Sequence, residues 1–193
     1  MAMTKKQTKK ATEKIQSMLN RTAKENDMWY FACAWTDKQG RQIFSDQYHS
    51  YRLNDPLDLP MMTDKLKEFR KSFCNRVEGV LDTCVKREQF RLDTPDIDTL
   101  KTFIAAKKAS DSYREARKAC IKPCVTWDFG TGYPLINANY LRELLSIFPD
   151  AVLYAVSHNA IKAPIYAVSA YGDAIIMPIR NDVKQAEMDA QSA

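Results

Sequence analysis

The sequence predicts an α+β domain built of two βαβββ-like halves, with a helical insertion between them. Three observations predict it. An amphipathic helix followed by three short runs of β-forming residues occurs near the N-terminus, the same order returns near the C-terminus, and a long stretch with helical periodicity separates the two copies. A supersecondary unit that occurs twice in one chain indicates a duplicated architecture, so duplication is the predicted plan of this fold.

The boundaries of the halves follow from the changes of period. The first half covers about residues 5–56, the insertion about 60–121, the second half about 123–180, and a C-terminal tail 181–193. A chain of 193 residues suits one domain that carries an insertion. Residues 1–193 are therefore predicted to form a single domain, in which the earlier copy has no obvious strand before its helix.

The first half opens with a helix predicted over Lys5–Lys24. Apolar residues recur there at helical spacing, and lysines dominate the remaining faces. Three segments rich in aromatic and β-branched residues follow and are predicted to be strands. They are Met28–Trp35, Arg41–Ser45 after a hairpin turn at Asp37–Gly40, and Tyr48–Leu53.

The insertion is predicted to be two helices. Apolar residues three or four apart predict the first over Asp64–Phe90, and Thr94-Pro95-Asp96 breaks it. Thr94 or Asp96 then caps a second helix that runs to about Cys120. Basic residues outnumber acidic ones on both helices, which favours a solvated helical face over a dedicated nucleic-acid groove.

The second half repeats the pattern of the first. Val125–Phe129 is predicted to be a strand, and Gly130–Pro134 a turn. A short helix with Asn137 or Asn139 as its N-cap follows and ends at Pro149. The last three predicted strands are Ala151–Ser157, Pro164–Ser169 and Ala174–Ile179.

Composition excludes several classes of protein. With 45% hydrophobic and 27% charged residues, the chain is typical of a globular protein, and no apolar run is long enough to span a membrane. Met1–Lys6 lacks the apolar core of a secretory signal, so a cytoplasmic location is expected. The five cysteines are irregularly spaced and are predicted to be free thiols. Cys120 and Cys124 have no nearby histidine, so neither a metal nor a cofactor is predicted.

No catalytic constellation is apparent, and the protein is not predicted to be an enzyme. Neither His49 nor His158 lies in a recognisable nucleophile motif. Gly130-Thr131-Gly132 lacks the third glycine and the Gly-Lys-Ser/Thr ending of phosphate-binding loops, so a flexible turn is favoured. Acidic residues at Asp93, Asp96 and Asp98 fit helix capping better than cation binding.

The first helix carries the strongest hint of a binding surface. Lys9, Lys10, Lys14 and Arg21 lie among its basic residues, and cations of this kind gain affinity for a phosphate backbone by releasing condensed counterions. A solvated, frayed terminus would have the same composition. The sequence leaves both interpretations open.

Three short segments resemble one known family, the bacterial DNA polymerase III β subunit, or sliding clamp. Asn137-Ala138-Asn139-Tyr140-Leu141 and Met177-Pro178-Ile179-Arg180 resemble the helix start and the C-terminal Met-Pro-x-Arg of its last domain. Ser45–Leu53 is similar to its Thr-Asp-Gly-Tyr/His-Arg stretch, with Gln47 and His49 in place of the usual Gly and Arg. The matches cover roughly the first quarter and the last third of the chain.

The resemblance implies a DNA-clamp (processivity) fold with helices on one face and continuous strands on the other. In clamps the helix face looks onto duplex DNA without reading bases. The Met-Pro-x-Arg segment helps to line a hydrophobic pocket for peptides of polymerases and repair proteins. A ring is built of six such domains, so a chain holding one would have to form a homo-oligomer to encircle DNA.

The sequence therefore predicts a non-enzymatic DNA-replication accessory that acts as a processivity factor or protein-interaction module. DNA phosphates would contact Lys9, Lys10, Lys14 and Arg21, and a partner peptide would bind at Met177, Pro178, Ile179 and Arg180. Replication or repair proteins are the expected partners, and no membrane partner is expected. The alternative is a solitary clamp-like module, such as a phage or mobile-element factor, that binds proteins but not DNA.

Overall fold

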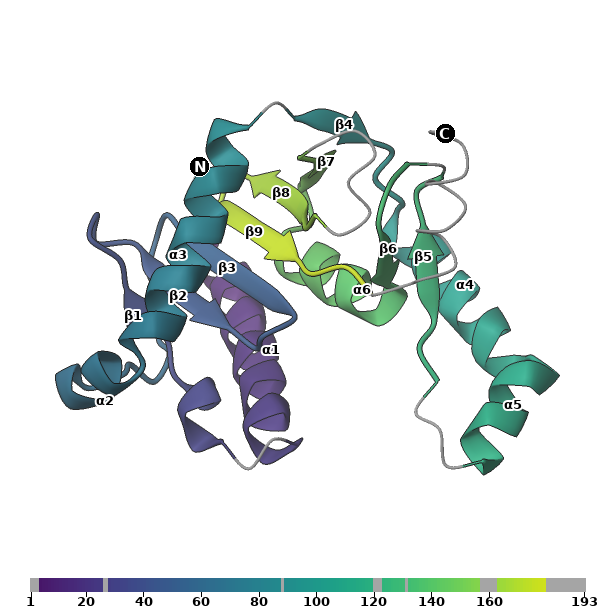
Figure 1. The fold of residues 1–193 in the computed structure, drawn as a ribbon, viewed down its shortest axis with the longest axis horizontal. Coiled ribbons are helices and arrows are strands. Elements are labelled where there is room, and N and C mark those ends of the chain that lie inside the picture. The colour runs from purple at the N-terminus through teal and green to yellow at the C-terminus, as the bar shows by residue number, and fades with distance from the viewer. Residues whose placement is uncertain are drawn as a thin grey trace, which may run out of the picture.

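The computed structural model describes residues 4–25, 28–87, 89–119, 123–130, 132–156 and 163–179, and confirms the α+β class (Figure 1). A seven-stranded antiparallel sheet lies at its centre. From edge to edge its strands are β1 (Trp35–Thr36), β2 (Gln42–Ser45), β3 (His49–Leu53), β9 (Gly172–Ile176), β8 (Ile165–Ser169), β7 (Val152–Ala155) and β4 (Phe90–Leu92).

Two three-stranded meanders meet in the middle of this sheet. Strands β1-β2-β3 come from the first half and β7-β8-β9 from the second, and they join through antiparallel pairing of β3 with β9, where Tyr51 lies opposite Ala174. The strand order reads the same outward from this joint in both directions. The two meanders are thus related by an approximate two-fold axis between β3 and β9, and the expectation of one shared sheet is confirmed.

One face of the sheet is covered by the helices that precede the two meanders. These are α1 (Lys5–Glu25) and α6 (Ala138–Ile147), which contact each other and bury Ile15, Leu141 and Leu144 against the sheet residues Phe44 and Tyr51. Asn137 caps α6, because its side chain accepts a hydrogen bond of 2.9 Å from the Asn139 N–H. Helix α4 (Ile97–Ala109) packs beside α6, and α5 (Asp111–Lys118) extends from it.

The other face is also covered, which corrects the expectation of bare strands. Helix α3 (Lys71–Lys86), preceded by the short α2 (Asp64–Phe69), lies over this face and buries Cys74, Val77 and Leu81 against Ile43 and Ile175 (Figure 1). The insertion therefore contributes helices to both sides of the sheet, because its first helix carries an apolar stripe of its own.

Arg52 fixes α3 to the joint between the halves. Its guanidinium, 3% exposed, donates to both carboxylate oxygens of Asp173 on β9, at 2.8 and 2.6 Å, and to Asp82 on α3 at 2.6 Å. Burial alone would lower the pKa of Arg52, but the hydrogen bonds and charges of Asp173 and Asp82 raise it. One buried cation thus links three elements that are far apart in the sequence.

The predicted strand Met28–Trp35 is wrong for most of its length. Residues Trp29–Ala32 form a 3₁₀ helix, η1, and only Trp35 and Thr36 pair in the sheet. Phe31 and Trp35 pack against the insertion. Phe31 packs edge-on against Phe73 of α3, with ring centroids 5.6 Å apart, and the Trp35 indole donates to Glu78 at 2.9 Å.

Several other boundaries differ from the predictions. The helix expected over Asp64–Phe90 is divided at Arg70 and ends before β4, and the next one is divided at Ser110, which caps α5. The strand pair β5 (Thr126–Asp128) and β6 (Leu135–Asn137) forms a second small sheet, so a strand precedes α6 directly. Asp96 is the N-cap of α4, and Gly40, with φ +81°, closes the predicted hairpin turn.

Candidate functional site

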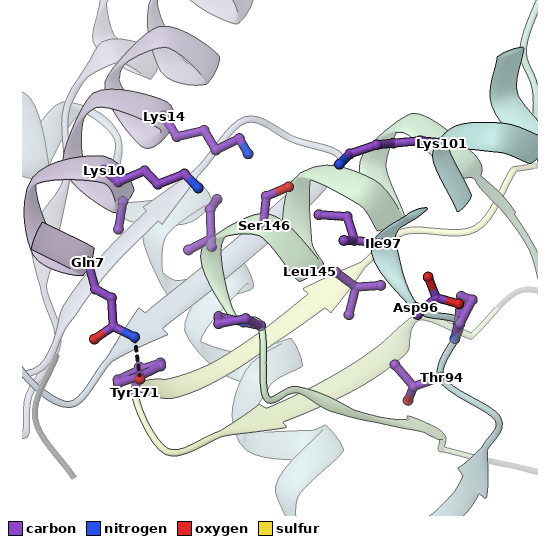
Figure 2. A pocket seen from close by; sticks show the side chains of 14 residues that line it. Gln7, Lys10, Lys14, Thr94, Asp96, Ile97, Lys101, Leu145, Ser146 and Tyr171 are labelled. Atoms are coloured by element: carbon purple, nitrogen blue, oxygen red, sulfur yellow. Dashed lines mark hydrogen bonds between the residues drawn. The ribbon is translucent and has the colours of Figure 1, made fainter. Parts of the chain in front are cut away.

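The most prominent basic concavity described lies between α1 and α4, with α6 as its floor. Figure 2 shows Lys10 and Lys14 reaching from α1, Lys101 from α4, and Ser146 of α6 between them. The main hollow has a volume of about 610 Å³, and a second hollow of about 360 Å³ adjoins it. Both are lined by Lys14, Lys101, Ser146 and Ile147, and the two adjoining hollows together are named here the basic groove.

The helical period places the lysines at the rim of the basic groove. Ala11 and Ile15 are buried on the inner side of α1, so Lys10 and Lys14, one turn apart, share the flank that faces α4. Leu100 and Ile104 anchor α4 in the same core, which leaves Lys101 on the flank that faces α1. Two helices fixed by one core therefore present cations to a common space.

The cations of the basic groove repel one another. Burial lowers the pKa of Lys14 first, and the positive charges of Lys10, Arg142 and Lys101 lower it further, while Glu143 opposes them. Glu143 is itself bound at both oxygens by Arg21, at 2.9 and 3.0 Å. A bound anion would relieve this repulsion, and it would raise the pKa of Lys14.

Two acidic side chains at the start of α4 lie close to the groove. The Asp96 carboxylate accepts hydrogen bonds from the Asp98 and Thr99 N–H groups and from the Thr99 hydroxyl, and these bonds lower its pKa. Asp98 accepts a hydrogen bond of 2.7 Å from Lys101, but both side chains are more than half exposed. An exposed pair of this kind contributes about 0–1 kcal/mol, so a phosphate can replace Asp98 as the partner of Lys101.

The predicted DNA-contacting residues have different places in this geometry. Lys10 and Lys14 line the basic groove, Arg21 lies at its far end in the ion pair with Glu143, and Lys9 is exposed without lining either hollow. Sequence reasoning missed Lys101 and Arg142. The signal for Lys101 was the basic excess of the insertion, and only the packing of α4 beside α6 brings that charge to α1.

A further hollow, lined by apolar side chains together with Ser, Gln and Arg residues, lies on the α3 side of the sheet. It has a volume of about 510 Å³ and is named here the apolar groove. Of the predicted peptide-pocket residues, Met177 lines it, whereas Pro178 and Ile179 do not, and the Ile179 N–H donates to the Leu135 carbonyl at 2.8 Å. Arg180, like Cys120 and His158, lies outside the described residues.

The insertion supplies the wall of the apolar groove that faces Met177. Phe69, Phe73, Val77 and Val80 line it, and Phe69 is 79% exposed. The Arg70 guanidinium lies 4.9 Å from the centroid of the Phe73 ring and 5.5 Å from that of Phe31, which orients it by cation–π contact. The arrangement combines exposed apolar side chains with guanidinium groups.

Three further titratable groups, His49, Asp46 and Cys84, are buried in the core. His49 is fully buried, and its Nδ1 lies 3.0 Å from Asp46, which also accepts hydrogen bonds from the Tyr48 and His49 N–H groups. Burial opposes the shift, but the charge and hydrogen bonds of His49 lower the pKa of Asp46. Burial also raises the pKa of the Cys84 thiol to about 11. Among the described residues, no group of three or more His, Cys, Asp or Glu side chains could hold a metal ion.

Neither protein-family models, nor curated proteins, nor solved structures give a match to this chain. Within the part of the chain that the structure describes, no helix combines the length and apolar character needed to cross a bilayer.

Proposed function

We propose that this protein is a non-enzymatic, cytoplasmic DNA-replication accessory, a sliding-clamp-like domain that contacts the nucleic-acid backbone through the basic groove. The observation that carries the proposal is the convergence of Lys10, Lys14, Lys101 and Arg142 from three helices on one concave surface. Cations gathered in this way bind phosphates by releasing counterions, without reading the base sequence.

The duplicated fold supports the clamp part of the proposal. Each three-stranded meander is preceded by a helix, the meanders join in one sheet, and α1 and α6 lie together on one face of it. In the sliding-clamp family this is the face that looks onto DNA, and here it is the face that carries the basic groove. Helix α3 on the opposite face distinguishes this chain from that pattern.

A ring around DNA would require several copies of this chain. Under this proposal the two halves make one clamp-like domain, so encirclement implies a homo-oligomer, whereas contact through the groove alone does not. Size-exclusion chromatography with light scattering distinguishes a ring-forming processivity factor from a monomeric accessory.

The experiment that tests the proposal is a salt titration of nucleic-acid binding by fluorescence anisotropy. We expect affinity to fall linearly with the logarithm of salt concentration, with a slope of about −3 to −4 if all four cations engage phosphates. A protein that binds neither single-stranded nor duplex DNA at 50 mM salt would contradict the proposal.

The apolar groove supports a second function, the docking of a peptide from a replication or repair protein. Met28, Phe69 and Met177, all partly or largely exposed, lie around one concavity, and exposed apolar side chains gathered in this way are typical of interaction sites. This is also the function of the alternative, a solitary module that does not bind DNA. Binding of partner peptides that is lost in Phe69→Ser, with DNA binding absent, would favour that alternative.

A further inference from the structure

The basic groove has two chemically different sides. In Figure 2, Lys10, Lys14 and Lys101 lie along one side of the main hollow, and Tyr171, Leu145 and Thr94 lie along the other. Further apolar residues line the same hollow, so cations and apolar side chains occupy one concavity. The apolar residues that line it with Leu145 and Tyr171 are Pro95, Ile97, Ile147 and Pro149.

A purely electrostatic backbone site has no use for the apolar side. A duplex presents its phosphates outward and keeps its bases stacked and paired inside, so it can engage only the lysines of the rim. A single strand has unstacked bases whose faces can leave water and pack against aromatic and apolar side chains. The hollow of about 610 Å³ is within the range of pockets that enclose small molecules, and a nucleobase is smaller than most of them.

We propose that the basic groove binds single-stranded nucleic acid in preference to duplex, with a base in the hollow against Tyr171 and the adjoining phosphates between Lys14 and Lys101. This inference rests on the proposed function, because it names the nucleic acid that the same groove takes. It goes beyond that function by assigning a base-contacting residue and a strand preference.

Tyr171 is attached to the sheet through its backbone and lines the hollow. The residue lies in the turn between β8 and β9, where its carbonyl accepts a hydrogen bond of 3.0 Å from the Asn54 N–H. The Gln7 side-chain amide of α1 donates to its hydroxyl at 3.5 Å. The backbone of Tyr171 is thus bound to the sheet, and its hydroxyl lies beside α1 at one end of the hollow.

The length of the groove fits a short strand. From Gln7 to Arg21, α1 rises about 21 Å, which spans at most about six nucleotides at the stacked spacing of about 3.4 Å, and fewer where the bases are unstacked. Negative charge is less favourable near Asp96, on the side opposite the rim lysines of α1. Phosphates are therefore expected along α1, and a base is expected toward Tyr171.

The test is a comparison of labelled twelve-nucleotide oligo-dT, the same length of oligo-U and a twelve-base-pair duplex, at 150 mM salt. We expect each single strand to bind with an affinity at least about tenfold higher than that of the duplex. Tyr171→Ala should weaken single-strand binding about tenfold and leave duplex binding unchanged, and Tyr171→Phe, which keeps the ring, should behave like the wild type.

A second measurement does not depend on a folded variant. Oligo-dT carrying 5-iodouracil is irradiated with the wild-type protein, and the linked peptide is identified by mass spectrometry. We expect the link at Tyr171. Duplex binding as tight as single-strand binding, or links only outside the groove, would overturn this inference and leave the proposed function intact. Absence of binding to all three probes would overturn both.

Discussion

The two faces of the central sheet are covered by helices of different origin, and they present different chemistry. On one face, α1 and α6 belong to the repeated helix-and-meander units, and with α4 they enclose the lysine-rich basic groove. On the other, α3 comes from the insertion and forms one wall of the apolar groove. The repeated units thus account for α1 and α6 on one face, whereas the insertion supplies α4 beside them and α3 on the other face.

The course of the insertion explains how a second surface is added to the two repeated units. The insertion leaves the sheet between Leu53 and β7, sends α3 across one face, adds β4 at the edge, and then places α4 on the opposite face. Arg52 is the point at which the duplicated sheet and the added helix are joined, since it binds both Asp173 and Asp82.

Replacing Arg52, which joins the sheet to α3, should reduce the stability of the protein most. Arg52→Met leaves Asp173, 13% exposed, without its buried cation, and we expect a loss of about 3–5 kcal/mol of unfolding free energy. Urea denaturation measures it. The matched control is Arg91→Met on the exposed side of β4, where a change within about 0.5 kcal/mol is expected. Equal effects of the two variants would contradict the role given to Arg52.

The next test breaks the seam between the two halves. Gly172 has a φ of +147°, and a Cβ at this position would lie 2.1 Å from the Arg52 carbonyl oxygen. Gly172→Ala should therefore cost about 2–4 kcal/mol through strain and steric overlap. Gly79→Ala on α3 adds a methyl group to open space and should stabilise the protein by about 0.5–1 kcal/mol. Stability is measured by thermal or urea unfolding. If both variants were more stable than the wild type, or both less stable, this explanation would be refuted.

A smaller effect is expected from acid on the face that carries α1 and α6. Asp46 is buried beside His49, and its pKa in the folded protein is lower than the ordinary value of 3.8. Its carboxylate therefore stabilises the fold above about pH 4, and this contribution is lost as the pH falls through the folded-state pKa. Asp46→Asn should be less stable by about 1–3 kcal/mol at pH 7 and should lose less stability than the wild type between pH 5 and 2. Parallel curves for the two proteins would contradict this.

The smallest expected effect on stability is at the apolar groove. Because Phe69 is 79% exposed, Phe69→Ser should change the unfolding free energy by less than about 0.5 kcal/mol and should leave nucleic-acid affinity unchanged. The variant should lose only the binding of partner peptides, measured by calorimetry. A Phe69→Ser protein that lost nucleic-acid binding would show that the two faces are not independent.

Local patterns predicted much of this fold. The apolar stripe of α1, the Asn137 cap of α6, the turn at Gly40 and the last three strands all follow from periodicity and from turn and capping chemistry. The interpretation of Asp96 as a helix cap is confirmed by its hydrogen bonds to Asp98 and Thr99. These features depend on neighbours within a few residues along the chain.

Features that depend on distant neighbours could not be predicted in this way. The aromatic content of residues 28–35 favoured a strand, but Phe31 and Trp35 are covered by Phe73 and Glu78, about forty residues away along the chain. The basic groove likewise needs Lys101, which reaches α1 only because α4 packs beside α6. The basic face of α1 alone could not predict that α4 forms the second wall of the basic groove.

We propose that nucleic acid binds to the basic groove specifically, and not simply to a molecule of positive net charge. Lys14→Glu and Lys9→Glu test it directly, because both reverse one charge on the same helix and only Lys14 lines the groove. By fluorescence anisotropy at constant salt, we predict that Lys14→Glu weakens binding of a twelve-nucleotide strand at least tenfold, while Lys9→Glu weakens it less than threefold. Equal losses in the two variants would contradict the account.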